Sequence, residues 1–241
     1  GLSEEFLGKF LTELREDNAA VFIGAGLSQA AGFVNWRGLL APIAQPLGLD
    51  VQKENDLVTL AQFHLNTNAG NRNQLNQLLI EQFTDLPTPT ENHRLLARLP
   101  IRSYWTTNYD RLIEQALKDS GKKVDAKYTV EQLALTVRGR DAVVYKMHGD
   151  IEQADKAVLT RDDYERYATT HAPFITALTG DPGVEFRAGQ LEAISQAHTI
   201  PVAAAITTAV AWLPGRSCRP CLGHPAECCT CSRRSTRRQA G

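Results

Sequence analysis

Apolar segments alternate with amphipathic segments along most of the chain. Three segments, AAVFIGAGLS (19–28), IRSYWTTN (101–108) and DAVVYKMHGD (141–150), each start as an apolar strand and then turn polar or glycine-rich. Between them, apolar residues recur every three or four positions, which predicts helices. Because parallel strands need a crossover between them, usually a helix, this alternation predicts a mostly parallel sheet that is buried on both faces.

The helical pattern gives this sheet its connections. Thr90 is in position to cap one helix, and Gly121 is in position to end another. Helices are predicted at the N-terminus, over NWRGLLAPIAQPLGL (35–49), twice between 56 and 83, over TPTENHRLLARLP (88–100), over YDRLIEQALKDSG (109–121) and over TRDDYERYATTH (160–171). Residues 1–172 therefore read as one doubly wound, Rossmann-like α/β body with an inserted helical region at about 50–95.

The chain changes character after Pro173. An apolar stretch without charge, TIPVAAAITTAVAWL (199–213), precedes an end rich in Cys, Arg, Pro and Gly. Residues 173–241 form a metal-bound unit, a disordered tail or a segment foreign to the body, and the sequence leaves these three interpretations open. All five cysteines lie between Cys218 and Cys231, so the body has no disulfide and no cysteine-bound metal. The adjacent pair Cys228 and Cys229 suits tetrahedral zinc poorly, and we do not expect zinc.

Bulk composition narrows the function classes. The 241 residues suffice for one large domain or one domain with an appendage. A formal net charge of −1 gives no overall basic field for nucleic acid. No apolar run approaches the roughly 18–20 residues that cross a bilayer. The acidic, amphipathic N-terminus differs from a secretory signal, so we predict a cytoplasmic protein.

The first segment with candidate chemistry is GAGLSQAAG (24–32), directly after the first predicted strand. Glycines there allow the backbone N–H groups to approach a phosphate, and a following helix N-terminus adds partial positive charge. The third glycine comes later than in the usual dinucleotide fingerprint. A turn needed only for packing of the strand on the helix is the alternative.

Two further polar clusters follow the second and third strands. Thr107 or Asn108 could simply cap the next helix, with Asp110 complementing its dipole, but one cap needs only one residue. A single histidine such as His148 is more often a structural residue than a catalytic one. Here Gly149 follows it at a strand end. Ligands of open parallel sheets bind outside the carboxyl ends of the strands, so we expect the three clusters to meet at one edge.

The ordered set GAGLS with NWR, then TTNYD, then HG resembles the sirtuin-like family of NAD-consuming proteins. The resemblance covers roughly Ala19 to Tyr167. Classical sirtuins have phenylalanine where Trp36 stands and glutamine where Thr107 stands. The Trp and Thr forms are similar to a bacterial branch whose members are fused to other domains and degrade NAD in defence against phage.

The resemblance implies a role for each motif residue. Gly24, Ala25, Gly26 and Ser28 would line the pyrophosphate and the adjoining ribose. Trp36 and Arg37 would lie near the nicotinamide ribose, beside Thr107 and Gly149 at the cofactor-binding edge. Asn108 would hold the ribose hydroxyls or a water, Asp110 would meet the nicotinamide carboxamide, and His148 would act as general base. These roles suit cleavage of the nicotinamide–ribose bond, which needs a held ribose, one base and one placed nucleophile.

Sirtuin deacylases carry a four-cysteine zinc module soon after HG, whereas DIEQADKAVLTRDDYERY (150–167) holds no cysteine. Water is therefore the expected acceptor. The sequence predicts a hydrolase that converts NAD, as its substrate, to nicotinamide and ADP-ribose. The resemblance also implies a homo-oligomer and a missing or separate sensor domain. A non-catalytic NAD- or ADP-ribose-binding module, and an NAD-dependent protein deacylase or ADP-ribosyltransferase, are the alternatives.

Overall fold

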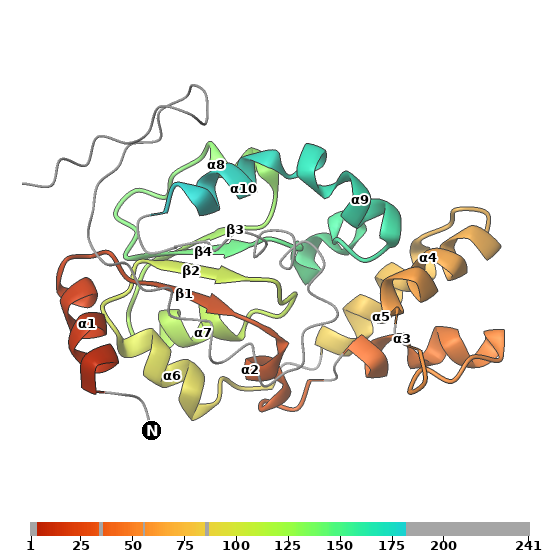
Figure 1. Cartoon of the computed structure of the whole chain (residues 1–241), viewed down its shortest axis with the longest axis horizontal. Coiled ribbons are helices and arrows are strands. Elements are labelled where there is room, and N and C mark those ends of the chain that lie inside the picture. The colour runs from red at the N-terminus through yellow and green to blue at the C-terminus, as the bar shows by residue number, and fades with distance from the viewer. Residues whose placement is uncertain (1–3, 34–35, 55, 85–86, 182–241) are drawn as a thin grey trace, which may run out of the picture.

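A parallel sheet forms the centre of the molecule (Figure 1). The structure is a computed structural model that describes residues 4–33, 36–54, 56–84 and 87–181. All strand pairs are parallel, in the order β1-β2-β4-β3. The strands are β1 (Ala20–Ile23), β2 (Ser103–Thr106), β3 (Val124–Lys127) and β4 (Ala142–Lys146). The predicted α/β class with a parallel sheet is confirmed.

Helices connect the strands and lie on both faces of the sheet (Figure 1). They are α1 (Glu4–Arg15), α2 (Ala25–Gln29), α3 (Trp36–Ala44), η1 (Gln45–Leu47), α4 (Leu57–Thr67), α5 (Asn73–Thr84), α6 (Glu91–Arg98), α7 (Leu112–Asp119), α8 (Val130–Leu133), η2 (Ile151–Lys156), α9 (Arg161–Thr170) and α10 (Ala172–Thr179). The predicted N-cap at Thr90 is confirmed: Thr90 is the N-cap of α6 and forms a capping box with His93, whose Nδ1 accepts the Thr90 backbone N–H at 3.2 Å. Gly121 follows α7 with φ +83°, as expected of a helix-ending glycine.

The two faces of the sheet carry separate apolar cores, since successive strand residues point to opposite sides. Tyr104 packs with residues of α1, α6 and α7 on one face. Its neighbour Trp105 packs with residues of α9 and α10 on the other face and stacks on Tyr145 with ring centroids 4.0 Å apart. The side chains of Tyr104 and Trp105 are both fully buried. This double covering explains why the strand segments read as apolar without alternation.

A helical lobe of α3, α4 and α5 lies beyond one end of the sheet (Figure 1). Its apolar core runs from Phe33 to Phe83 and meets the body at Tyr109 and Leu159. Helix α6 belongs instead to the layer that covers the sheet, because it packs against α7. The lobe runs from α3 to α5, and the helical insertion expected at about 50–95 stays a prediction.

Two elements differ from the sequence prediction. Strand β3, with the sequence VDAK, was not expected. Helix α7 begins at Leu112 and not near residue 109, and neither Thr107 nor Asn108 caps it. Arg111 is the N-cap residue and makes no side-chain cap hydrogen bond. Asp110, one residue earlier, accepts a hydrogen bond from the Leu112 backbone N–H with its Oδ1 at 3.0 Å.

The described body continues past the composition change at residue 173. Phe174 and Leu178 of α10 are fully buried in the same core as Trp105. The indole N–H of Trp105 also donates to Asp181 Oδ2 at 2.9 Å. Residues 182–241, with all five cysteines, lie outside the described residues, and the division into domains stays a prediction.

An ion pair joins the helical lobe to the body. Arg72, just before α5, contacts Asp163 of α9, with Nη1 and Oδ2 2.8 Å apart. The same oxygen accepts the backbone N–H groups of Leu159 and Thr160. Burial raises the pKa of Asp163, but Arg72 and these N–H groups outweigh it and leave the pKa below its ordinary value.

Asp163→Asn is therefore expected to lower the free energy of unfolding by about 1–2 kcal/mol at pH 7. Because the folded-state pKa is lowered, this contribution is present above the ordinary carboxyl pKa and is lost as the pH falls through the folded value. Urea unfolding at pH 7 and pH 3 measures this. The difference in free energy of unfolding between Asp163→Asn and the parent should be smaller at pH 3 than at pH 7. Asp162→Asn, an exposed neighbour on the same helix, is the control; equal gaps at both pH values would contradict the assignment.

Candidate active site

The carboxyl ends of three neighbouring strands meet at one edge of the sheet. In the register, Ile23 pairs with Thr106, and Thr106 pairs with Lys146. The Met147 N–H then donates to the Thr106 carbonyl at 2.9 Å. The segments that follow β1, β2 and β4 therefore leave the sheet side by side, as the sequence predicted for its three polar clusters.

Three side chains from two of these segments form one buried hydrogen-bonded cluster. Ser28 Oγ donates to Asp110 Oδ2 at 2.5 Å. Asn108 Nδ2 donates to Ser28 Oγ at 2.7 Å and to the Gly24 carbonyl at 3.0 Å. The three side chains are at most 9% exposed. Residues eighty or more positions apart thus share one set of polar contacts, called here the Ser28–Asn108–Asp110 cluster.

The glycine-rich segment is more compact than its pattern indicated. Helix α2 begins at Ala25, directly after Gly24, so no separate loop precedes it. Gly24 has an extended backbone with φ −111°, and Gly26 lies within the helix. The positive φ falls later, at Gly32 (+101°). The segment presents Ser28 to the cluster, and Gly24 contributes its carbonyl oxygen.

His148 follows β4 at the same edge and is 2% exposed. Its Nδ1 lies 3.4 Å from the hydroxyl of Tyr164, whose ring meets the imidazole edge-on. The next residue, Gly149, has φ +94°, and a Cβ there would lie 3.0 Å from the Cα of Ala157. Both the backbone angle and the close approach require glycine at this position. The HG pair thus fixes where the imidazole leaves the strand.

The remaining predicted residues make contacts outside the cluster. Trp36, the first residue of α3, meets the Tyr109 ring edge-on with centroids 6.3 Å apart. Arg37 Nη1 donates to the backbone carbonyls of Val51 at 2.5 Å and Glu54 at 2.8 Å. Thr107 is partly exposed. Its neighbour Thr106 is buried, and its hydroxyl accepts the Asn108 backbone N–H at 3.0 Å.

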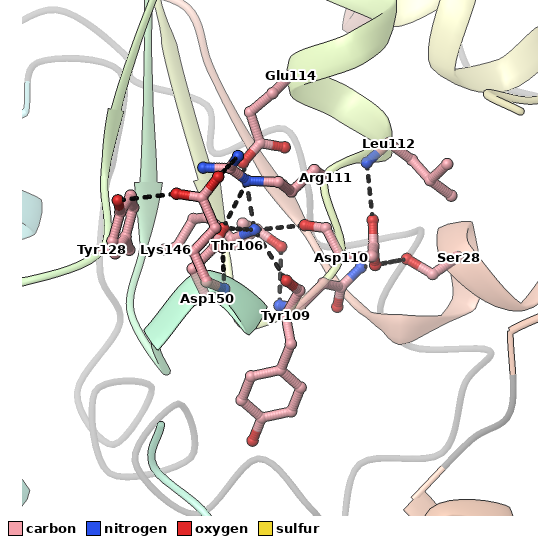
Figure 2. Close-up of polar contacts among 12 residues, drawn as sticks. Ser28, Thr106, Tyr109, Asp110, Arg111, Leu112, Glu114, Tyr128, Lys146 and Asp150 are labelled. Atoms are coloured by element: carbon pink, nitrogen blue, oxygen red, sulfur yellow. Dashed lines mark hydrogen bonds and ion pairs between the residues drawn. The ribbon is translucent and has the colours of Figure 1, made fainter. Parts of the chain in front are cut away.

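Sequence reasoning missed a charged network directly behind the cluster (Figure 2). Lys146 and Asp150 are fully buried and form an ion pair with Nζ and Oδ2 2.6 Å apart. Glu114 of α7 lies 3.2 Å from the same ammonium, and Arg111 binds Asp150 at 3.2 Å. The sequence did contain a signal for this network: Lys146 ends an otherwise apolar strand, and Asp150 follows four residues later.

Part of the chain that carries the candidate site is similar to a known protein family. A family model described as a SIR2-like domain matches residues 102–186, which include β2, β4 and the HG pair. Residues 102–186 of this chain are therefore similar to the SIR2-like domain family. The resemblance stated from the motifs is confirmed.

Curated relatives of this SIR2-like chain bear the name NAD(+) hydrolase ThsA. The protein of Bacillus cereus (strain MSX-D12) is 58% identical over 178 residues, which are 74% of this chain and 37% of the relative. That of Acinetobacter baumannii (strain 532279) is 53% identical over 73% of this chain and 36% of the relative. The protein of Enterococcus faecium is 48% identical over 72% of this chain and 36% of the relative. The chain spans just over a third of the length of these relatives.

The SIR2-like site combines groups that can orient a sugar and move a proton. An amide and a carboxylate lie on one strand end and an imidazole on the next, all largely excluded from water. Within the described ranges, no three His, Cys, Asp or Glu side chains gather as metal ligands. None of the helices described is long and apolar enough to cross a bilayer.

Proposed function

We propose that this SIR2-like chain hydrolyses NAD at the bond between nicotinamide and ribose. The observation that carries the proposal is the buried Ser28–Asn108–Asp110 cluster at the strand ends, one strand away from His148. The name of the relatives, NAD(+) hydrolase ThsA, supports the same chemistry. An open parallel sheet binds ligands at this edge, which also supports the proposal.

In the proposed reaction, the bond between the nicotinamide nitrogen and ribose C1′ breaks, and nicotinamide leaves as a neutral base. An oxygen of water forms the new bond to C1′, and the water gives one proton to His148. The products are nicotinamide, ADP-ribose and a released proton. Asn108 orients the ribose hydroxyls or the water, because its amide can donate and accept without competing as a base.

The other residues have proposed binding roles. Gly24, Ala25, Gly26 and Ser28 would face the pyrophosphate and adjoining ribose, and Asp110 the carboxamide. Each Asp110 oxygen accepts one hydrogen bond from the protein, and a carboxylate oxygen has a second lone pair for the ligand. Trp36, Arg37, Thr107 and Gly149 would border the nicotinamide end. Water is the acceptor in this proposal.

The biological setting is a proposal as well. Destruction of NAD harms the cell that makes the enzyme, so we propose that a sensor or regulatory part keeps it inactive until triggered. Defence against phage is the setting that the resemblance implies. A cytoplasmic location and a homo-oligomer belong to the same proposal.

Incubating the purified chain with NAD, followed by chromatography of the products, tests the activity. We expect nicotinamide and ADP-ribose in equal amounts, with no label transferred to protein from labelled NAD. Calorimetry on the same preparation separates the alternatives. Heat of binding without products would instead support a binding module, and labelled protein would support a transferase or deacylase.

A further inference from the structure

The charged network behind the cluster is centred on the ammonium group of Lys146. Lys146 ends β4 and is completely buried. Its Nζ lies 2.6 Å from Asp150 Oδ2 and 3.2 Å from Glu114 Oε1. Isolated charges are costly to bury, so a lysine at this depth needs close partners.

The same ammonium also contacts the backbone of the turn that carries the candidate site. Lys146 Nζ donates to the Tyr109 carbonyl at 3.1 Å and to the Asp110 carbonyl (Figure 2). The side chains of Asn108 and Asp110 leave this turn on the side of Ser28. The turn is thus held from one side by Lys146 and contacts Ser28 on the other.

The surrounding charges keep the lysine protonated. Burial lowers the pKa of Lys146, but the carboxylates of Glu114 and Asp150 outweigh burial and raise its pKa above the ordinary value. Burial raises the pKa of Glu114. Asp150 has a second cationic partner, Arg111, whose Nε lies 3.2 Å from Oδ2. The positive charge at Nζ therefore persists at neutral pH and remains available to the two carbonyls.

We propose that Lys146 is a positioning residue: by holding the carbonyls of Tyr109 and Asp110, it fixes the orientation of the Asn108 amide and the Asp110 carboxylate in the Ser28–Asn108–Asp110 cluster. This inference rests on the proposed function for its effect on turnover. Without the ammonium, both carbonyls lose this donor, and the Tyr109 carbonyl keeps the longer hydrogen bond from the Ile151 N–H at 3.4 Å. The turn must then shift to satisfy the carbonyls fully. A shift of about 1 Å in a group that orients substrate can cost about 10²-fold in rate.

The test compares two variants that share the loss of the Glu114 charge. Glu114→Gln leaves the contacts of Lys146 with the two carbonyls. Glu114→Gln with Lys146→Met removes them, while Asp150 keeps Arg111 as its partner, so no buried charge is left unbalanced. We expect kcat for nicotinamide release within about threefold of the parent for the single variant. For the double variant we expect a loss of about 10²-fold, larger in kcat than in KM.

A second readout does not need turnover. The side-chain amide protons of Asn108, followed by NMR in isotope-labelled protein, should exchange slowly in the parent and in Glu114→Gln. They should exchange faster in the double variant. A purely structural role for Lys146 predicts a lower melting temperature with unchanged kcat and unchanged Asn108 exchange at temperatures where both variants are folded; that result would overturn the proposal.

A third variant, Lys146→Arg, keeps a positive charge at this buried position and so avoids leaving the carboxylates without a cation. A planar guanidinium cannot place one compact charge on both carbonyls, so we expect faster Asn108 exchange and lower kcat here too. If Lys146→Arg had the same Asn108 exchange rate and the same kcat as the parent, the positioning role of Lys146 would be contradicted. If the parent itself releases no nicotinamide, the proposed hydrolysis fails, and the Asn108 exchange rates alone still decide the role of Lys146.

Discussion

His148→Ala should lower the rate of nicotinamide release by about 10²–10⁴-fold, the usual contribution of a positioned acid or base. The expected loss follows from the proposed role of His148 as the base that accepts the proton of the attacking water. An imidazole suits this task because its ordinary pKa lies near neutrality. The measurement is the initial rate of nicotinamide release under saturating NAD, at a temperature where the variant is folded.

The matched control is His64→Ala in α4. His64 is also a buried imidazole, at 5% exposure, but it belongs to the helical lobe. We expect its loss to lower stability while kcat stays within about threefold, since it takes no part in the chemistry. Asn108→Ala should abolish release, a larger loss than that expected for His148→Ala. Undiminished turnover in both the His148 and Asn108 variants would rule out this site.

Gly149→Ala is expected to lower the free energy of unfolding by about 2–4 kcal/mol. A side chain at φ +94° costs about 1–2 kcal/mol. The added Cβ would also lie 3.0 Å from the Cα of Ala157, and backbone atoms cannot move aside as a flexible side chain can. Chemical denaturation with the slope held common to both proteins measures the difference.

Gly121→Ala separates the cost of a side chain at positive φ from the cost of the close contact with Ala157. Gly121 has a similar φ of +83°, but a Cβ there meets nothing within 4 Å. It should therefore show only the backbone cost of about 1–2 kcal/mol. Equal losses for the two variants would mean that the contact with Ala157 adds nothing. Because Gly149 directly follows His148, the larger loss should be accompanied by reduced turnover in the folded protein.

Strands with apolar runs could be predicted from the sequence, whereas β3 could not. In VDAK, Asp125 and Lys127 are polar, yet both are buried, at 2% and 3% exposure. They are accommodated because Lys127 Nζ and Asp125 Oδ1 pair at 2.7 Å, and Arg140 adds a further contact to Asp125. Such pairing depends on residues up to fifteen positions away, so local hydropathy does not indicate the strand.

The start of α7 was predicted three residues too early for a similar reason. Thr107 and Asn108 have the composition of helix caps, and local propensity favours that use. In the folded chain Asn108 bonds to Ser28 and Gly24 instead. A tertiary contact overrode a local preference.

By itself, the sequence determined the α/β class, the motifs at three strand ends and the resemblance to the sirtuin-like family, because periodicity and motif order are local properties of the chain. Only the tertiary structure decided which of those polar groups touch. The hydrogen bonds of Ser28 to Asn108 and Asp110, and the burial of Lys146 behind them, depend on strand register and on side chains far apart in sequence. Charged side chains can be buried only where the fold places partners of opposite charge beside them. A local sequence pattern does not show how far apart such partners lie in the folded chain.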